Sequence, residues 1–129
     1  MSNAFLRTRR DEILHNAVTK LSPQPMAAAI ITIDGLSIAA YPIYGDNDIR
    51  REEDRVSGMS AAMLSLGERI SDVLLLGQMR ETIIRGDDGI VIQLNSGEWV
   101  LTAKFKGIVA LDSVLSQLQV AIKEIDKLL

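Results

Sequence analysis

Residues 26–41 read MAAAIITIDGLSIAAY, and this stretch decides the fold. Met26 to Ile33 is an almost continuous apolar run of the length of a buried strand, and Leu36 to Tyr41 forms a second run. Asp34 and Gly35 lie between the two runs. This dipeptide favours a tight hairpin turn, because glycine readily adopts the positive φ that the turn requires. The sequence therefore predicts an antiparallel hairpin.

Two helices are predicted on either side of the hairpin. Residues 5–21 carry apolar side chains at helical spacing until Ser22-Pro23-Gln24-Pro25, where proline prevents the helix from continuing. After a polar loop from Pro42 to Glu53, the clearest helix runs from Asp54 to about Leu75, and Gly77 closes it. Its apolar positions step by three and four residues and form one stripe: Val56, Met59, Met63, Leu66, Ile70 and Val73.

Three further strands are predicted at Met79–Arg85, Ile90–Leu94 and Glu98–Phe105, with turns rich in glycine and aspartate or asparagine between them. A last helix runs from about Asp112 to the end of the sequence. We therefore expect an α+β fold, a five-stranded and mostly antiparallel sheet with helices on both faces, in the order α-β-β-α-β-β-β-α. The length of 129 residues suits one domain, so we expect a single domain over residues 1–129.

The composition argues against several classes of function. With no cysteine and one histidine, His15, the sequence lacks the side chains of disulfides, thiol catalysis and the usual zinc sites. It has no phosphate-binding glycine loop and no nucleophile elbow. A net charge of −3, with both signs mixed along the chain, gives no reason to expect nucleic acid or anionic lipid as the main partner. We expect no catalytic residue, no cofactor and no metal, and, without a signal peptide or an apolar run of membrane-spanning length, a cytoplasmic location.

The chain resembles a Roadblock domain, of the dynein light-chain family, over about residues 5–128. Asp34-Gly35-Leu36-Ser37-Ile38-Ala39 resembles the first hairpin of that family, and the central helix, rich in small residues, resembles its dimer-forming helix. Gly89 to Leu94 followed by Gly97 to Leu101 resembles its closing meander. Leu111 stands where the family usually enters the final helix with a leucine.

This resemblance implies a Roadblock/profilin-like fold and a role in protein–protein interaction. Roadblock domains pair through the third strand and the central helix into one continuous sheet, and they serve Ras-like small GTPases, gliding-motility systems and dynein motors as scaffolds or regulators. A stand-alone domain of this size is most similar to the prokaryotic MglB-type regulators. The resemblance therefore implies a non-enzymatic homodimer that activates or binds a Ras-like small GTPase in signalling. The alternative is a ligand-binding sensor or a motor-adaptor dimerisation module.

The central helix carries a candidate dimer surface beside its apolar stripe. A row of mostly small residues follows the same helical spacing: Ser57, Ser60, Leu64, Gly67 and Ser71. Small residues allow another helix to come close, and glycine inside a helix costs roughly 1 kcal/mol relative to alanine. We predict that the apolar stripe packs on the sheet and that the small-residue row meets a second subunit. The alternative is that the row faces solvent or packs under a loop.

The third strand adds Thr82, Ile83 and Ile84 to the candidate dimer surface. This strand is apolar on both faces, and such a strand at a sheet edge promotes aggregation unless a second subunit pairs with it. The alternative is a central strand that has a neighbour on each side.

A charged segment before the central helix is a candidate surface for the GTPase. Arg50, Arg51 and Arg55 flank three acidic residues, and Glu68 and Arg69 follow on the helix. An arginine here could assist phosphate chemistry on a partner. The simpler interpretation, which we favour for the arginines, is a solvated loop whose acidic residues favour the helix N-terminus. His15 is interpreted as an ordinary surface residue and Trp99 as a packing residue.

Overall fold

The computed structural model describes residues 3–42 and 47–129, with side chains described for residues 5–42 and 53–129. Its elements, in chain order, are α1 Asn3–Val18, β1 Ala27–Thr32, β2 Ser37–Tyr41, α2 Asn47–Val73, β3 Glu81–Arg85, β4 Gly89–Asn95, β5 Trp99–Lys106 and α3 Leu111–Leu128. This order and the α+β class confirm the prediction from sequence. One boundary was wrong, because α2 begins at Asn47, inside the segment predicted as a loop. Arginine and glutamate, which are good helix formers, make up much of residues 50–55, and no glycine or proline interrupts them.

All neighbouring strands of the five-stranded sheet are antiparallel, in the order β2-β1-β5-β4-β3. The predicted hairpin is present as β1 and β2, with Gly35 at a φ of 91° in its turn. The register shifts between Ile30 and Ile31, which places an irregularity in β2 next to Ile38. Because β2 and β3 stand at the two ends of the strand order, they are the edges of the sheet.

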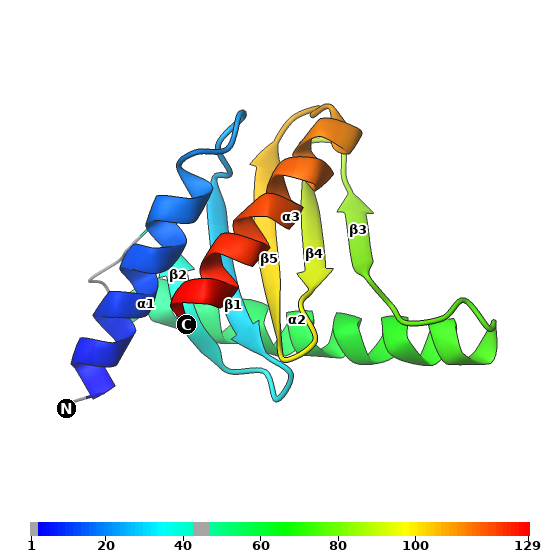
Figure 1. Cartoon of the computed structure of the whole chain (residues 1–129), viewed down its shortest axis with the longest axis horizontal. Helices are drawn as coiled ribbons and strands as arrows, with labels where there is room; N and C mark the ends of the chain where they lie inside the picture. The colour runs from blue at the N-terminus through cyan, green and yellow to red at the C-terminus, as the bar shows by residue number, and fades with distance from the viewer. Residues whose placement is uncertain (1–2, 43–46) are drawn as a thin grey trace.

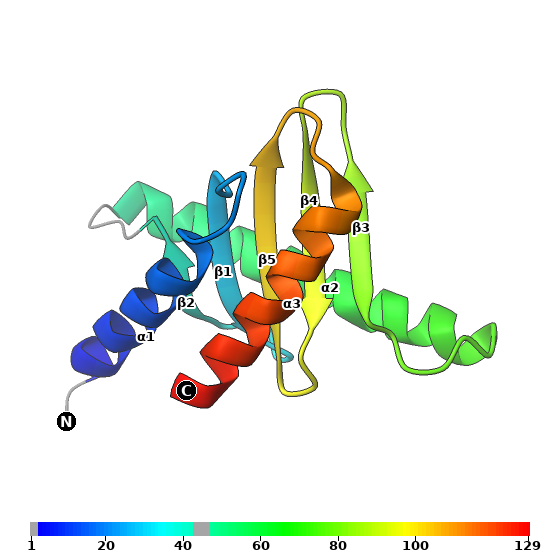
Figure 2. The same cartoon turned by 45° about the horizontal axis from the view of Figure 1, so that its top comes forward.

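The three helices are divided between the two faces of the sheet. α1 and α3 cover one face, and α2 crosses the other (Figures 1 and 2). The larger core lies under α1 and α3 and includes Leu14, Ile92, Phe105, Leu118 and Ile125, all almost fully buried. The cluster under α2 is smaller: Ala29, Ile31, Leu64, Met79 and Val100. No helix in the described part of the chain is long and apolar enough to cross a membrane.

α2 is longer than the sheet is wide. Its C-terminal turns pass β3 and continue beyond the edge of the sheet (Figures 1 and 2). This overhanging end has none of the chain's own strands beneath it in either view, and the apolar residues at the end of α2 and just after it, Val73 and Leu74–Leu76, are exposed.

A glycine contact between β4 and β5 gives a first test of the fold. A Cβ built on Gly89 would lie 2.7 Å from the main-chain oxygen of Phe105, whereas a Cβ on Gly58 in α2 meets nothing within 4 Å. We expect Gly89→Ala to lower the free energy of unfolding by about 1–3 kcal/mol. Gly58→Ala should raise it by up to about 1 kcal/mol, because alanine is the better helix former. Denaturant unfolding of both variants measures this, and equal stability of Gly89→Ala and the parent would contradict the close approach.

Candidate functional site

The small-residue row of α2 faces the chain's own sheet. Ser57, Ser60 and Leu64 are 1%, 2% and 3% exposed. The main-chain oxygen of Ser60 accepts a hydrogen bond from Gln93 Nε2 at 2.7 Å. The side-chain hydroxyl of Ser60 accepts a second hydrogen bond, from Thr102 Oγ1 at 3.3 Å. Two polar side chains of β4 and β5 thus fix the rotation of α2 about its own axis.

The predicted helix part of the dimer surface was therefore wrong. It comprised Ser57, Ser60, Leu64, Gly67 and Ser71; four of these residues are buried within the chain, and Gly67 lies against Met79 and Thr82. Close packing at Gly67 is real, but its neighbour is Met79 of the same chain, whose Cγ would lie 3.2 Å from an added Cβ. The reason for the reversal is that the sheet under α2 is partly polar. A bulky apolar row there would leave the Gln93 and Thr102 side chains without these partners.

The apolar stripe of α2, predicted to be buried, lies on the outside. Met59, Leu66 and Val73 are 54%, 60% and 71% exposed, Ile70 is also exposed, and Val56 and Met63 are half-buried. The three residues after the helix, Leu74–Leu76, extend this exposed surface. An apolar surface of this length on a globular chain is typical of a protein–protein contact.

The end of α2 carries an additional sign of a contact. The Leu76 N–H donates to the Ser71 carbonyl at 2.8 Å, a helix-ending bond that requires a left-handed residue just before it. That residue is Leu75, with a φ of 57°, where glycine is the usual choice. The left-handed backbone costs a non-glycine residue roughly 1–2 kcal/mol, and Leu75 is 90% exposed, so packing within this chain does not offset the cost. A residue that is held in an unfavourable backbone conformation, as Leu75 is, is typical of a functional site.

The third strand is an edge strand, as predicted for Thr82, Ile83 and Ile84. β3 pairs only with β4 and ends the sheet. Ile83 and Ile84 are exposed, and Thr82 is half-buried. The Thr82 hydroxyl would lie 3.5 Å from a Cβ on Gly67, so this part of α2, which also carries Leu66 and Ile70 of the apolar stripe, lies close to the open edge.

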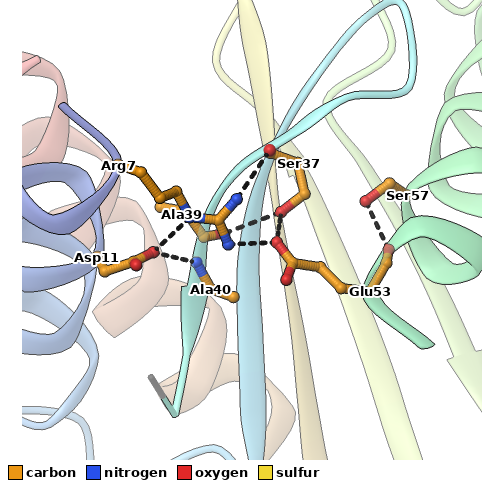
Figure 3. A network of polar contacts seen from close by, with 7 residues as sticks. All are labelled: Arg7, Asp11, Ser37, Ala39, Ala40, Glu53 and Ser57. Atoms are coloured by element: carbon orange, nitrogen blue, oxygen red, sulfur yellow. Dashed lines mark hydrogen bonds and ion pairs between the residues drawn. The ribbon is translucent and has the colours of Figure 1, made fainter. Parts of the chain in front are cut away.

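The opposite edge, β2, is occupied by side chains from α1 (Figure 3). Asp11 Oδ1 accepts the main-chain N–H of Ala40 at 2.9 Å, and Arg7 Nη1 donates to the main-chain oxygen of Ser37 at 3.1 Å. Arg7 Nε also donates to Asp11 at 3.0 Å, and its Nη2 bonds to Glu53 of α2. Sequence reasoning missed this network. The i, i+4 spacing of Arg7 and Asp11 on one helix was a signal for its first pair only.

The positive charge of Arg7 is stabilised by the two carboxylates that it contacts, Glu53 and Asp11. Burial alone would lower the pKa of Arg7, but hydrogen bonds and charge from Glu53 and Asp11 outweigh that effect and raise it above its ordinary value. Arg7 therefore remains a cation that holds two carboxylates from different helices.

The predicted partner surface is only partly described. Arg55, Glu68 and Arg69 are exposed on α2, whereas the side chains of Arg50 and Arg51 lie outside the described residues. At 100° per residue, Arg69 lies on the side of α2 away from the small-residue row, whereas Glu68 lies about 20° from Ser57 and borders that row. α2 thus has three faces: one on the sheet, one apolar and exposed, and one charged.

The remaining sequence candidates have structural roles. His15 is exposed, with its ring 5.5 Å from that of Tyr41, and Trp99 is buried and donates its Nε1–H to Asp126. Among the described residues, no group of three or more histidine, aspartate or glutamate side chains could hold a metal ion.

The rotation of α2 can be tested by placing a charge on two of its faces. Ser60→Arg should force a guanidinium between α2 and the sheet and lower the free energy of unfolding by at least about 3 kcal/mol. Ser65→Arg, on the charged and exposed face, should change it by less than about 0.5 kcal/mol. Thermal melting followed by circular dichroism separates the two variants. Equal melting temperatures would mean that α2 is rotated differently.

Comparison with known proteins supports the fold but not a close relationship. No protein-family model matches the sequence, and no curated protein matches it. The structure is similar to a Roadblock/LC7 domain from Streptomyces avermitilis, with a TM-score of 0.77, 15% identity, and 91% of this chain and 94% of that chain covered. It is also similar to MglB from Myxococcus xanthus, with a TM-score of 0.72, 12% identity, and 95% and 92% covered.

The similarity extends to profilin. The profilin of Schizosaccharomyces pombe matches with a TM-score of 0.60 and 12% identity, over 90% of this chain and 96% of that chain. Such low identities establish architecture alone. The TM-scores and the coverage of more than nine tenths of both chains show that the whole architecture of this chain is shared with these Roadblock proteins. The chain has the fold of a stand-alone Roadblock/LC7-type domain.

Proposed function

We propose that this chain forms a homodimer through the apolar stripe of α2 and the open edge of β3, and that the dimer is a non-enzymatic scaffold or regulator of a Ras-like small GTPase. The observation that carries the proposal is the exposed apolar stripe lying beside an unpaired strand. An exposed apolar stripe and an unpaired edge strand each promote aggregation in water, and one partner could cover both. The resemblance to Roadblock domains, which implies a Ras-like GTPase as partner, and the fold shared with MglB support the choice of a GTPase.

A two-fold pair satisfies the geometry of this surface. Two β3 strands placed antiparallel across a two-fold axis would join two sheets into one, and each would supply the other's missing neighbour. Because α2 extends past β3, its end would then pass beneath the sheet of the partner (Figure 1). The exposed leucines at that end would gain a surface to pack against.

The chain has a suitable surface for the overhanging end on the same face of its sheet. Lys104 lies opposite Val91, which lies opposite Ile84, and this row is two residues along from Thr102 and Gln93, which contact α2. A shallow groove of about 500 Å³ runs over the row. It is lined in part by Met26, Ile84, Val91, Lys104 and Lys106.

Charged residues line both surfaces. Lys104 and Lys106 are exposed in the groove, which Asp87 and Asp88 also line, so its charge is mixed. The end of α2 carries Glu68, Arg69 and Asp72, has no basic residue in its last turn, and ends in the negative pole of the helix dipole. In a second copy, the two lysines of the groove are the groups that would meet these carboxylates and this negative pole.

The pairing is tested by one charge on the apolar stripe and the same charge one residue away. Leu66→Glu would bury a carboxylate in the proposed interface and should weaken dimerisation at least about 100-fold, as expected for a central apolar contact. Ser65→Glu adds the same charge on the charged face and should leave the dimer intact. Analytical ultracentrifugation over a dilution series measures the dimer dissociation constants of both variants. A parent chain that is monomeric at tens of micromolar would disprove the pairing.

The charged face of α2 remains available in such a pair. At 100° per residue, Arg55 has the same helical angle as Val73 and Arg69 lies about 40° from it, so both arginines border the apolar stripe, and a dimer would present two copies of them on one side of the joined sheet. Charges at the rim of a contact mainly change association rates. We therefore assign the encounter with the GTPase to this face, and the dimer supplies no nucleotide-binding loop of its own.

The partner assignment is tested by reversing two arginines. A Ras-like GTPase from the same organism is loaded with GDP or a non-hydrolysable GTP analogue and applied to the immobilised dimer. Arg55→Glu combined with Arg69→Glu should slow association about tenfold at low salt, with less effect at high salt. Lys123→Glu on α3, on the opposite face of the sheet, is the matched control. Equal association of parent and double variant would remove this face from the contact, and no binding to either nucleotide form would refute the GTPase assignment.

A further inference from the structure

The β2 edge of the sheet is closed by side chains of α1, although it is an edge like β3. An open edge strand exposes N–H and C=O groups that another strand can pair with. We propose that Asp11 and Arg7 close the β2 edge against strand pairing with a second copy of this chain. The closure itself does not depend on the proposed function; only the length of the assemblies described below rests on the proposed pairing at β3.

Asp11 and Arg7 occupy one donor and one acceptor of β2. The Ala40 N–H donates to Asp11 at 2.9 Å, and the Ser37 carbonyl accepts from Arg7 at 3.1 Å (Figure 3). Asp11 is only 7% exposed, so this carboxylate is built into the contact between α1 and β2. A strand approaching β2 would have to displace both side chains before it could form its own ladder.

The closing side chains are themselves held from α2. Arg7 bonds to Asp11 within α1 and to Glu53 across to α2, and Glu53 also accepts the Ser37 hydroxyl (Figure 3). The Ser57 hydroxyl donates to the main-chain oxygen of Glu53, which ties the network to the buried row of α2. Three elements therefore hold the guanidinium in front of the strand.

The two edges have opposite consequences for assembly. Pairing at β3 alone is isologous and stops at two subunits. If β2 were also open, β3 contacts and β2 contacts could alternate, and the sheet could grow without limit. The α1 side chains thus limit the assembly to a closed pair.

Removing the Asp11 carboxylate tests the closure. Asp11→Ala frees the Ala40 N–H, and we expect assemblies whose mass rises steadily with concentration in analytical ultracentrifugation. Asp11→Asn keeps an acceptor oxygen in the same place and should retain the mass of the parent. Asp11→Ala with Ala40→Pro has no N–H at this position and should also stay at that mass, because proline blocks an edge strand. If the chains instead aggregated because they unfold, the proline at position 40 would not prevent the increase in mass.

The outcomes separate this inference from the proposed dimer. Growth of the Asp11→Ala, Ala40→Pro variant to the same extent as Asp11→Ala would overturn the closure, as would a folded Asp11→Ala chain with the parent's mass. Adding Leu66→Glu to Asp11→Ala should leave only pairs joined through β2. Continued growth there would refute the α2 and β3 surface while leaving the closure standing.

A measurement on the unmodified chain covers the case in which the Asp11→Ala variants do not fold. Hydrogen exchange by NMR should find the Ala40 amide protected at least about 100-fold over an unstructured amide, because its N–H donates a hydrogen bond to Asp11 Oδ1. Exchange at the rate of a free amide would overturn the proposal.

Discussion

The hydrogen bond between the Gln93 side chain and the Ser60 carbonyl sets the rotation of α2, and the outer surface of the molecule follows from it. Gln93 is fully buried in the middle of the sheet, where a side-chain amide without a partner costs about 1–3 kcal/mol. A helix face with small residues comes close enough to supply an acceptor for its Nε2, whereas its Oε1 is buried without a hydrogen-bond partner among the described residues. The larger apolar residues of the same helix must then point outward, which creates the stripe next to β3.

The packing of α2 on its own sheet therefore contributes only a modest stabilising free energy. Leu64 is the only large apolar side chain in the described part of the helix that is fully buried, and burial of one leucine contributes about 1.5–3 kcal/mol. The opposite face of the sheet, under α1 and α3, holds most of the buried apolar side chains. The molecule thus has a firmly packed half and a half whose outer apolar surface is uncovered.

The order and class of the elements could be predicted from the sequence, because strand and helix periods and the turn at Gly35 are local signals. The rotation of α2 could not be predicted from its own pattern. An apolar stripe at helical spacing is the same whether it packs on the chain's own sheet or on another copy. Gln93 and Thr102, polar residues within apolar strands, were the available signal. The Arg7 network joins three elements far apart in sequence, so no local pattern contains it.

The overhang of α2 also has a genetic consequence. In the proposed pair, the end of each helix lies beneath the sheet of the other subunit, so residues such as Leu75 would serve a neighbouring polypeptide more than their own. A defect there would be carried into every mixed pair. In a cell that makes normal and altered chains together, damage to this short tip would act dominantly, whereas damage to the core under α1 and α3 would remain confined to the altered chain and behave as recessive.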